Sequence, residues 1–138
     1  MSQLSEFNRN VIEEFRANGG KVGGMFANAS ILLLTTTGAK SGRSYTTPLV
    51  YSKDGERIVV IASKAGADTN PDWYHNLKAH PLVTVELGTV RFQARAAIAA
   101  GEERQRLFNR QAAQWTAFND YQARTKRQIP VIVLTRVD

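Results

Sequence analysis

Six short apolar segments, rich in β-branched residues, are the feature that most restricts the fold of this chain. Their length and composition are typical of strands, and the tight-turn sequences Asp54-Gly55 and Gly88-Thr89 join two pairs of them. Hairpins pair strands antiparallel, and helices and strands do not alternate regularly, which argues against a doubly wound parallel sheet. We therefore predict the α+β class, with a small, mostly antiparallel, six-stranded β-barrel and flanking helices. The expected strands are Ile31–Thr37, Thr46–Tyr51, Arg57–Ser63, Leu82–Leu87, Val90–Ile98 and Ile129–Arg136.

Three further segments carry helical periodicity or clear helix-end signals. Ser5 is the expected N-cap of the first helix, and the third helix has acidic residues at its start, as the helix dipole prefers. Asn70 is expected to cap the second helix, with Pro71 in its first turn. The expected helices are Ser5–Ala17, Pro71–Ala79 and a segment that begins at Gly101 and ends near Tyr121–Arg127.

The chain has 138 residues, which is the size of one domain. We expect residues 1–30 to form a helix and a connector that pack on a cofactor-binding barrel of residues 31–138. The sequence shows no signal peptide and no apolar run long enough to span a membrane, so a cytoplasmic protein is expected. The first helix is amphipathic and is a candidate for peripheral membrane contact, although the glutamates on its polar face disfavour anionic lipid. These glutamates are Glu6, Glu13 and Glu14.

The net charge of +6 favours an anionic partner, either a polyanionic cofactor, a nucleic acid or a membrane surface, unless it serves solubility alone. Nucleic acid is disfavoured because the aromatic residues fall in helical segments, whereas base stacking needs them on a strand face. No cysteine is present, so disulfides and cysteine metal sites are excluded. His75 and His80 are five residues apart and would lie on different faces of a helix, so no metal site is expected.

The strongest candidate for ligand binding is the turn Gly38–Arg43, which lies between two strands inside the stretch Thr35–Val50. Glycines let the backbone turn tightly and offer amide groups to an anion. Lys40 adds a compact charge, Arg43 a planar fork, and neighbouring serines add hydroxyl groups. An ordinary basic hairpin loop would have the same features. The segment Ser63-Lys64-Ala65-Gly66 repeats this chemistry at the end of another strand, so that the two segments could converge on one ligand.

Aromatic residues form two further candidate regions. The helix start Asn70–Asn76 exposes amides that carry positive partial charge, and Trp73 offers a flat surface beside them. Trp73 and Leu77 are four residues apart, which equally suits two core residues. A second group, Trp115, Phe118 and Tyr121, is spaced by three and would form a drifting stripe on a helix, either in the core or at the rim of a pocket.

Motifs of several enzyme classes are missing. The sequence has no Walker loop, no Gly-x-Gly-x-x-Gly after a strand and no Gly-x-Ser-x-Gly. Nothing in it forms an obvious nucleophile or acid–base pair. An enzyme without obvious catalytic side chains often delegates the reaction to a cofactor, and the protein then supplies binding, orientation and electrostatics.

Three motifs, in the right order, resemble the deazaflavin-dependent nitroreductase family of actinobacteria, which are split β-barrel proteins that use coenzyme F420. These motifs are TTTGAKSGRSYTTPLVY, ASKAGADTNPDWYHNLKAHP and YQARTKRQIPVIVL, and the similarity runs from about Asn10 to the C-terminus. The resemblance implies an oxidoreductase that transfers a hydride from reduced F420 to a quinone, a nitro compound or an activated alkene. The alternatives are an FMN-binding relative in the same barrel and a non-catalytic F420 carrier.

The resemblance also implies roles for particular residues. The Ala39–Ser41 loop and the Tyr45–Val50 strand would hold the phosphate and oligoglutamate tail and pass under the ring, Ile61–Lys64 would line the ring, and Asp72–Asn76 would close around the cofactor. Tyr121 and Ser63 are the expected catalytic residues, at the substrate end and at the ring edge. The expected substrate pocket is Trp115, Phe118 and Tyr121. The expected cofactor-binding residues are Ala39, Lys40, Ser41, Arg43, Tyr45, Thr46, Thr47, Pro48, Leu49, Val50, Ile61, Ala62, Ser63, Lys64, Asp72, Trp73, Tyr74, His75 and Asn76.

Two departures from the family pattern bear on function. The family often has arginine where this chain has Tyr45, and the nearest arginine here is Arg43. If Arg43 does not reach the tail, affinity for long oligoglutamate chains should fall. Trp115 and Phe118 stand where nitroimidazole-reducing members have tyrosines, so quinones or other planar acceptors are favoured. The sequence does not decide between a monomer and a homodimer.

Overall fold

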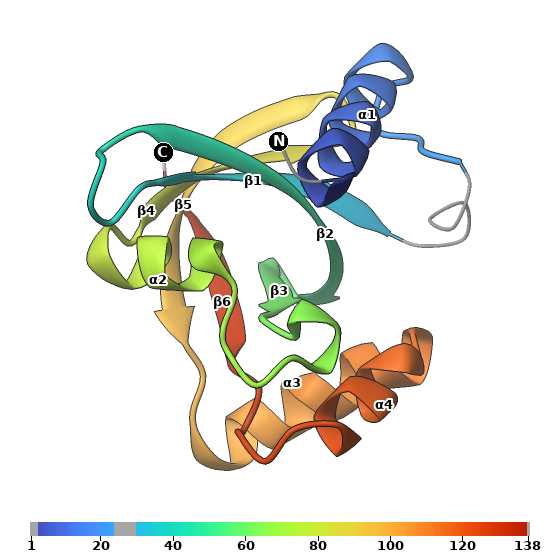
Figure 1. The fold of residues 1–138 in the computed structure, drawn as a ribbon, viewed down its shortest axis with the longest axis vertical. Coiled ribbons are helices and arrows are strands. Elements are labelled where there is room, and N and C mark those ends of the chain that lie inside the picture. The colour runs from blue at the N-terminus through green and yellow to red at the C-terminus, as the bar shows by residue number, and fades with distance from the viewer. Residues whose placement is uncertain (1–2, 24–29, 138) are drawn as a thin grey trace.

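The computed structural model describes residues 3–23 and 30–137, which form a closed six-stranded barrel with helices on its outside (Figure 1). The strand order around the barrel is β1-β2-β3-β6-β5-β4, and every neighbouring pair is antiparallel. The predicted α+β class and the six-stranded barrel are therefore confirmed. The strands are β1 Ile31–Thr37, β2 Ser44–Asp54, β3 Arg57–Ile61, β4 Leu82–Leu87, β5 Val90–Ile98 and β6 Val131–Val137. The helices are α1 Gln3–Ala17, α2 Asp72–Ala79, α3 Gly101–Gln114, α4 Ala117–Ala123 and the 3-10 turn η2 Lys64–Gly66.

β3 is the most thoroughly buried strand because both of its faces are covered. Ile58 and Val60 join the main cluster of apolar side chains, which also holds Leu32, Leu34 and Trp73. The alternate residues Val59 and Ile61 join a second cluster, under α3 and α4. This explains the continuous apolar run in β3, since side chains along a strand alternate between its two faces.

α1 packs against the barrel through Phe15, which is buried against Ile31 and Leu33 of β1. The guanidinium of Arg16 also forms an ion pair with Glu86 of β4, with Nη2 and Oε2 2.8 Å apart. The connector predicted after this helix falls partly on residues 24–29, which lie outside the described residues. In the part of the chain that the structure describes, no helix is long and apolar enough to cross a membrane. Peripheral membrane contact through α1 stays a prediction.

Several element boundaries differ from the prediction. α1 begins at Gln3, so Ser5 lies inside the helix and is not its N-cap. β3 ends at Ile61, two residues early, because the chain then turns into η2. The predicted third helix is two helices, since α3 ends at Gln114 and α4 begins at Ala117. β2 is longer than predicted, and β6 runs from Val131 to Val137.

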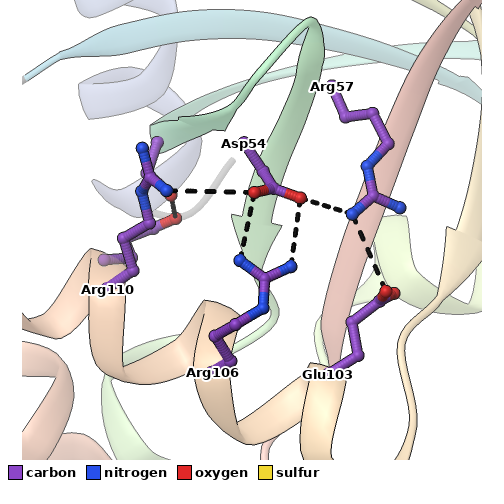
Figure 2. Close-up of polar contacts among 7 residues, drawn as sticks. Asp54, Arg57, Glu103, Arg106 and Arg110 are labelled. Atoms are coloured by element: carbon purple, nitrogen blue, oxygen red, sulfur yellow. Dashed lines mark hydrogen bonds and ion pairs between the residues drawn. The ribbon is translucent and has the colours of Figure 1, made fainter.

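α3 is fixed to the β2–β3 turn by a cluster of charges around Asp54 (Figure 2). Arg106 donates two hydrogen bonds to the Asp54 carboxylate, at 3.1 and 3.2 Å, and Arg57 pairs with the same carboxylate. Arg110 Nη1 lies 3.8 Å from Asp54 Oδ1, and Glu103 Oε2 lies 3.7 Å from Arg57 Nη2, which extends the network. The hydrogen bonds from Arg106 and then Arg57 hold the pKa of Asp54 far below its usual range. This contact positions α3 and, through it, the following α4.

Candidate cofactor site

The loop between β1 and β2 is a tight turn that presents two cations to solvent. The Gly38 amide donates to the Arg43 carbonyl at 2.7 Å, and the Gly42 amide donates to the Gly38 carbonyl at 3.1 Å. Gly42 has φ +72°, which favours glycine. Lys40 and Arg43 are exposed on this turn, as are Ala39 and Ser41.

Tyr45 folds back onto this loop, so it shapes the turn where the family often has an arginine. Its hydroxyl lies 3.0 Å from Ser41 Oγ, which also accepts a hydrogen bond from the Arg43 amide at 3.2 Å. A Cβ at Gly38 would collide with Ser41 Oγ and would lie 2.8 Å from Cε2 of Tyr45. A larger residue at position 38 would therefore require the Ser41 and Tyr45 side chains to shift, while Lys40 and Arg43 remain the loop's positive charges.

α2 lies beside the loop between β1 and β2 (Figure 1). It holds the loop in place through the side chain of Asn76, which is buried. Asn76 Oδ1 accepts a hydrogen bond from the Ala39 amide at 3.0 Å, and Nδ2 donates to Thr36 Oγ1 at 3.2 Å. Thr35 Oγ1 and Thr46 Oγ1 are 2.8 Å apart, which ties β1 to β2 at the same end. The loop is thus anchored at both sides, and both ends of the Asn76 amide bond to the protein itself.

The rest of α2 divides between core and surface. Trp73 is 7% exposed and Tyr74 is 8% exposed, and both belong to the main cluster, so the core alternative for Trp73 is correct. Asp72 and His75 are exposed, and the N-cap is Pro71 instead of Asn70. Asn70 is not available as the cap because its side-chain oxygen accepts a hydrogen bond from Arg127 at 2.8 Å.

The turn after β3 has an unusual backbone. Lys64 and Ala65 have φ values of +48° and +53°, and Gly66 follows at +84°. Residues other than glycine rarely adopt this left-handed conformation, which costs about 1–2 kcal/mol for each. Ser63 is buried at the start of the turn and Lys64 is exposed. Such strain persists only where surrounding contacts over-determine the conformation.

Arg127, which sequence reasoning missed, supplies many of these contacts. Its guanidinium donates to the carbonyls of Ala67, Ala62 and Ser63 at 2.8, 3.3 and 2.8 Å. With Asn70 Oδ1 this gives four acceptors, and all four belong to the segment that leads from β3 to α2. Burial lowers the pKa of Arg127, while nearby Asp68 raises it. A lone arginine after a helix gives no sequence signal for this role, because its partners, three backbone carbonyls and the Asn70 side chain, lie 57 to 65 residues away.

α4 packs directly on the same turn and brings Tyr121 to it. A Cβ at Gly66 would lie 2.8 Å from the Tyr121 carbonyl oxygen, and Arg124 Nη1 donates to the Ala65 carbonyl at 3.4 Å. The Tyr121 ring is half-buried and meets the Phe118 ring edge-on, with centroids 5.8 Å apart. Figure 1 shows α4, in orange-red, beside the green turn that follows β3. The structure thus joins the predicted ring edge to the predicted substrate end.

The aromatic stripe predicted from the spacing of three residues is interrupted. Trp115 lies at the break between α3 and α4 and is half-buried, whereas Phe118 is 5% exposed and belongs to the second cluster. Trp115 and Tyr121 also pack against that cluster. Of the three expected pocket residues, Trp115 and Tyr121 are partly exposed, whereas Phe118 is buried and packs edge-on against the Tyr121 ring.

The remaining expected residues of the barrel wall lie along β2 and at the end of β3. Thr46, Thr47, Leu49 and Val50 are half-buried, while Pro48, Ile61 and Ala62 are buried. The segment from Ala62 to Pro71 contains η2 and leads from β3 to α2. It therefore joins the turn that α4 packs on to the helix that holds the basic loop. The exposed donors at the two ends, Lys40 and Arg43 on the loop and Lys64 on the turn, fit a ligand with a negatively charged tail. Within the described residues, no group of His, Cys, Asp and Glu is placed to hold a metal ion.

A closed antiparallel barrel with exposed basic residues on the turns after β1 and β3 fits the class of split-barrel proteins that bind an anionic cofactor. The family model of F420H2-dependent quinone reductases matches residues 7–136, and the chain belongs to that family. It is an F420-dependent oxidoreductase, with coenzyme F420 as its cofactor.

The chain is similar to curated and solved proteins of the same kind. It is 39% identical to an F420H2-dependent quinone reductase of Mycobacterium tuberculosis over 128 residues. The matched region covers 88% of this chain and 85% of that protein. A solved F420-H2 dependent reductase has a TM-score of 0.71 and 36% identity, and covers 76% of this chain and 93% of that one. A solved domain-swapped dimer has a TM-score of 0.73 and 32% identity, over 96% of this chain and 99% of that one.

Proposed function

We propose that this protein reduces a quinone to a hydroquinone at the junction of the β3 turn and α4. Reduced F420, when bound, supplies the hydride, and the second hydrogen of the hydroquinone arrives as a proton. The family model, named for quinone reduction, supports this acceptor. The observation that supports the location is the close packing of Gly66 against Tyr121, where a Cβ added at Gly66 would lie 2.8 Å from the Tyr121 carbonyl oxygen. The turn that begins at Ser63 therefore lies beside the helix that carries Tyr121.

The β1–β2 loop is the proposed holder of the phosphate and oligoglutamate tail. Lys40 and Arg43 are exposed on a turn whose backbone is fixed by the Gly38–Arg43 hydrogen bond and by Asn76. Ion pairs at an exposed site are weak individually, so several charges must act together on a polyanionic tail. Arg43, two residues before Tyr45, is the arginine that would replace the one expected at position 45.

Ser63 and Lys64 are proposed to lie at the reactive edge of the ring. The left-handed backbone at Lys64 and Ala65 forms the turn that follows β3, and Ser63 is buried at the start of that turn. A wall that is rigid before the ligand arrives costs less entropy on binding and holds the reactants at the separation that hydride transfer needs.

Tyr121 is proposed to donate a hydrogen bond to the acceptor. Negative charge develops on a quinone oxygen as hydride arrives, and a fixed hydroxyl donor stabilises that charge. In the described part of the chain, the Tyr121 hydroxyl has no protein hydrogen-bond partner, whereas its ring is held by Phe118. The ring is fixed and the donor is left for a ligand.

The test combines binding with turnover. We expect F420 fluorescence to be quenched at micromolar protein, and reduced F420 to be oxidised with menadione faster than with a nitroimidazole or with cyclohexenone. Faster oxidation by the nitroimidazole or by cyclohexenone would contradict the quinone assignment. Binding without turnover of any acceptor would favour the carrier function, and a yellow protein with a flavin absorption band would favour FMN.

A further inference from the structure

We propose that Arg127 is a positioning residue for the reaction: its guanidinium sets the shape of the Ser63–Gly66 turn and locks that turn to the helix that carries Tyr121. The inference rests on the proposed function, because it takes Ser63 and Lys64 to lie at the ring edge. It adds a residue that contacts neither the cofactor nor the acceptor but determines how the cofactor and the acceptor meet.

The first observation is that the Arg127 guanidinium donates hydrogen bonds to four acceptors in the segment that joins β3 to α2. Nη2 donates to the Ser63 carbonyl at 2.8 Å, and Nη1 donates to the Ala62 carbonyl at 3.3 Å. On the far side of the turn, Nε donates to the Ala67 carbonyl at 2.8 Å and Nη1 donates to Asn70 Oδ1 at 2.8 Å. One planar group therefore bonds to both sides of the turn and fixes the distance between them.

The second observation is that, among the described residues, few other hydrogen bonds support the turn: Arg124 Nη1 donates to the Ala65 carbonyl at 3.4 Å, and Lys64 Nζ donates to Thr69 Oγ1 at 3.2 Å. The backbone of the turn closes with two hydrogen bonds, from the Gly66 amide to the Ser63 carbonyl at 3.0 Å and from the Ala67 amide to the Lys64 carbonyl at 3.1 Å. These bonds enclose the left-handed residues Lys64 and Ala65. Because a strained backbone relaxes when its supports are removed, the guanidinium is needed to keep Ser63 and Lys64 where they are.

The third observation is that Arg127 is itself fixed by α4. Its carbonyl accepts a hydrogen bond from Gln122 Nε2 at 2.8 Å, and its amide lies 3.3 Å from Thr125 Oγ1. Gln122 is the residue next to Tyr121. Arg127 thus connects the backbone beside Tyr121 with the backbone of Ser63, so a displacement of either is transmitted to the other.

Lysine cannot make this set of bonds. An ammonium group is a compact charge on a flexible stem, whereas the guanidinium spreads five N–H donors over a rigid plane. Arg127→Lys keeps the positive charge and loses the geometry, so it separates positioning from general electrostatics.

Arg104 offers a matched control. It is 4% exposed, and its guanidinium donates to the Ile129 carbonyl at 2.6 Å and to Gln122 Oε1 at 2.9 Å. It stabilises the same C-terminal segment, but it forms no hydrogen bond to residues 62–70 among those that the structure describes. Arg104→Lys therefore measures the cost of losing a buried guanidinium, without direct loss of the turn's supports.

The experiment measures binding of F420 and of its tail-less deazaflavin by fluorescence quenching, and amide hydrogen exchange of Gly66 and Ala67 without cofactor. Loss of charged hydrogen bonds to the turn should weaken both ligands equally in Arg127→Lys, by about tenfold or more, because the ring edge is common to both. Asn70→Ala removes one of the four acceptors and should give a smaller equal loss. Added guanidinium ion at millimolar concentration should restore part of the affinity of Arg127→Ala.

The outcomes are separable. In Arg127→Lys, faster exchange at Gly66 and Ala67 than in Arg104→Lys, together with equal weakening of both ligands, supports the inference. Equal behaviour of the Arg127 and Arg104 variants overturns it. If the wild-type protein binds neither ligand, the proposed function fails, whereas the exchange comparison still decides the role of Arg127. If Arg127→Lys does not fold, Asn70→Ala carries the same comparison, and unchanged affinity in it counts against the inference.

Discussion

The side-chain oxygen of Asn76 accepts a hydrogen bond from the Ala39 backbone amide at 3.0 Å, so helix α2 grips the basic loop between β1 and β2. The other end of the same side chain donates to Thr36, a buried threonine of β1. One amide thus fixes both the loop and the strand that leads into it, and the orientation of Lys40 depends on a residue 36 positions away along the chain.

Asn76→Ala should weaken binding of tailed F420. The change leaves the Ala39 amide and the buried Thr36 hydroxyl without partners, which costs about 1–3 kcal/mol of stability and loosens the loop. Titration by fluorescence quenching should show weaker binding of F420, with a smaller change for the tail-less deazaflavin. The exposed Asn109 of α3 serves as the control, since Asn109→Ala should leave both affinities unchanged. Equal losses for the two ligands in Asn76→Ala would refute the loop's role.

Lys40→Ala should also weaken tailed F420 more than the tail-less deazaflavin. Its charge is exposed, so the loss from one pair is small at about 0.2–1 kcal/mol, and it should shrink further as salt is added. Lys53 is exposed near the other end of β2 and is the matched control. A loss in Lys40→Ala that does not depend on salt or on the tail would contradict the assignment.

Gly66→Ala should destabilise the protein and displace α4. The new Cβ meets the Tyr121 carbonyl oxygen at 2.8 Å in addition to the strain of φ +84°. Gly55→Ala has a similar strain, at φ +64°, but no atom within 4 Å of the new Cβ. Chemical denaturation should give about 1–2 kcal/mol for Gly55→Ala from backbone strain alone, and clearly more for Gly66→Ala. Equal losses of the free energy of unfolding in the two variants would show that α4 can move away from the new Cβ without destabilising the protein.

Asp54→Asn should remove an acid-sensitive part of the stability. The pKa of Asp54 is lowered in the folded protein, first by Arg106 and then by Arg57. A carboxyl group whose pKa falls on folding stabilises the protein above its unfolded pKa of about 4, and that stability is lost as pH falls through the folded pKa. The wild-type protein should therefore be more stable than Asp54→Asn at pH 7, and the difference should shrink below pH 4. Glu56→Gln, on the same turn, is the control, and a constant difference for Asp54→Asn across this range would count against the charge cluster.

The barrel could be predicted from the sequence because its signals are local. The run Arg57–Ile61 reads as a strand by composition, and the alternation of Val83 and Val85 with polar neighbours places one face inside. The same local signals gave errors where a distant partner decides the outcome. Asn70 has the sequence signal of a helix cap, but its side-chain oxygen accepts a hydrogen bond from Arg127 instead. The helix predicted from Gly101 is interrupted at Trp115.

The site shows the same division between local and distant determinants. Gly38–Arg43 is recognisable because its glycines and cations are adjacent, and the structure finds a tight, exposed basic turn there. Its anchoring through the Asn76 side chain joins residues far apart in the sequence, which periodicity cannot reveal. The spacing of Trp73 and Leu77 suits either cofactor contact or the core, and the structure buries Trp73 in the main cluster at 7% exposure.

The most direct test of the account is the oxidation of reduced F420 by menadione, followed under single-turnover conditions in the wild-type protein and in Tyr121→Phe. We predict rapid oxidation by the wild type. In the variant we predict a rate lower by about tenfold or more with nearly unchanged F420 affinity, because only a hydrogen bond that strengthens in the transition state is lost. Equal rates in the two proteins would contradict the role of Tyr121, and no oxidation of reduced F420 by the wild type would contradict quinone reduction itself.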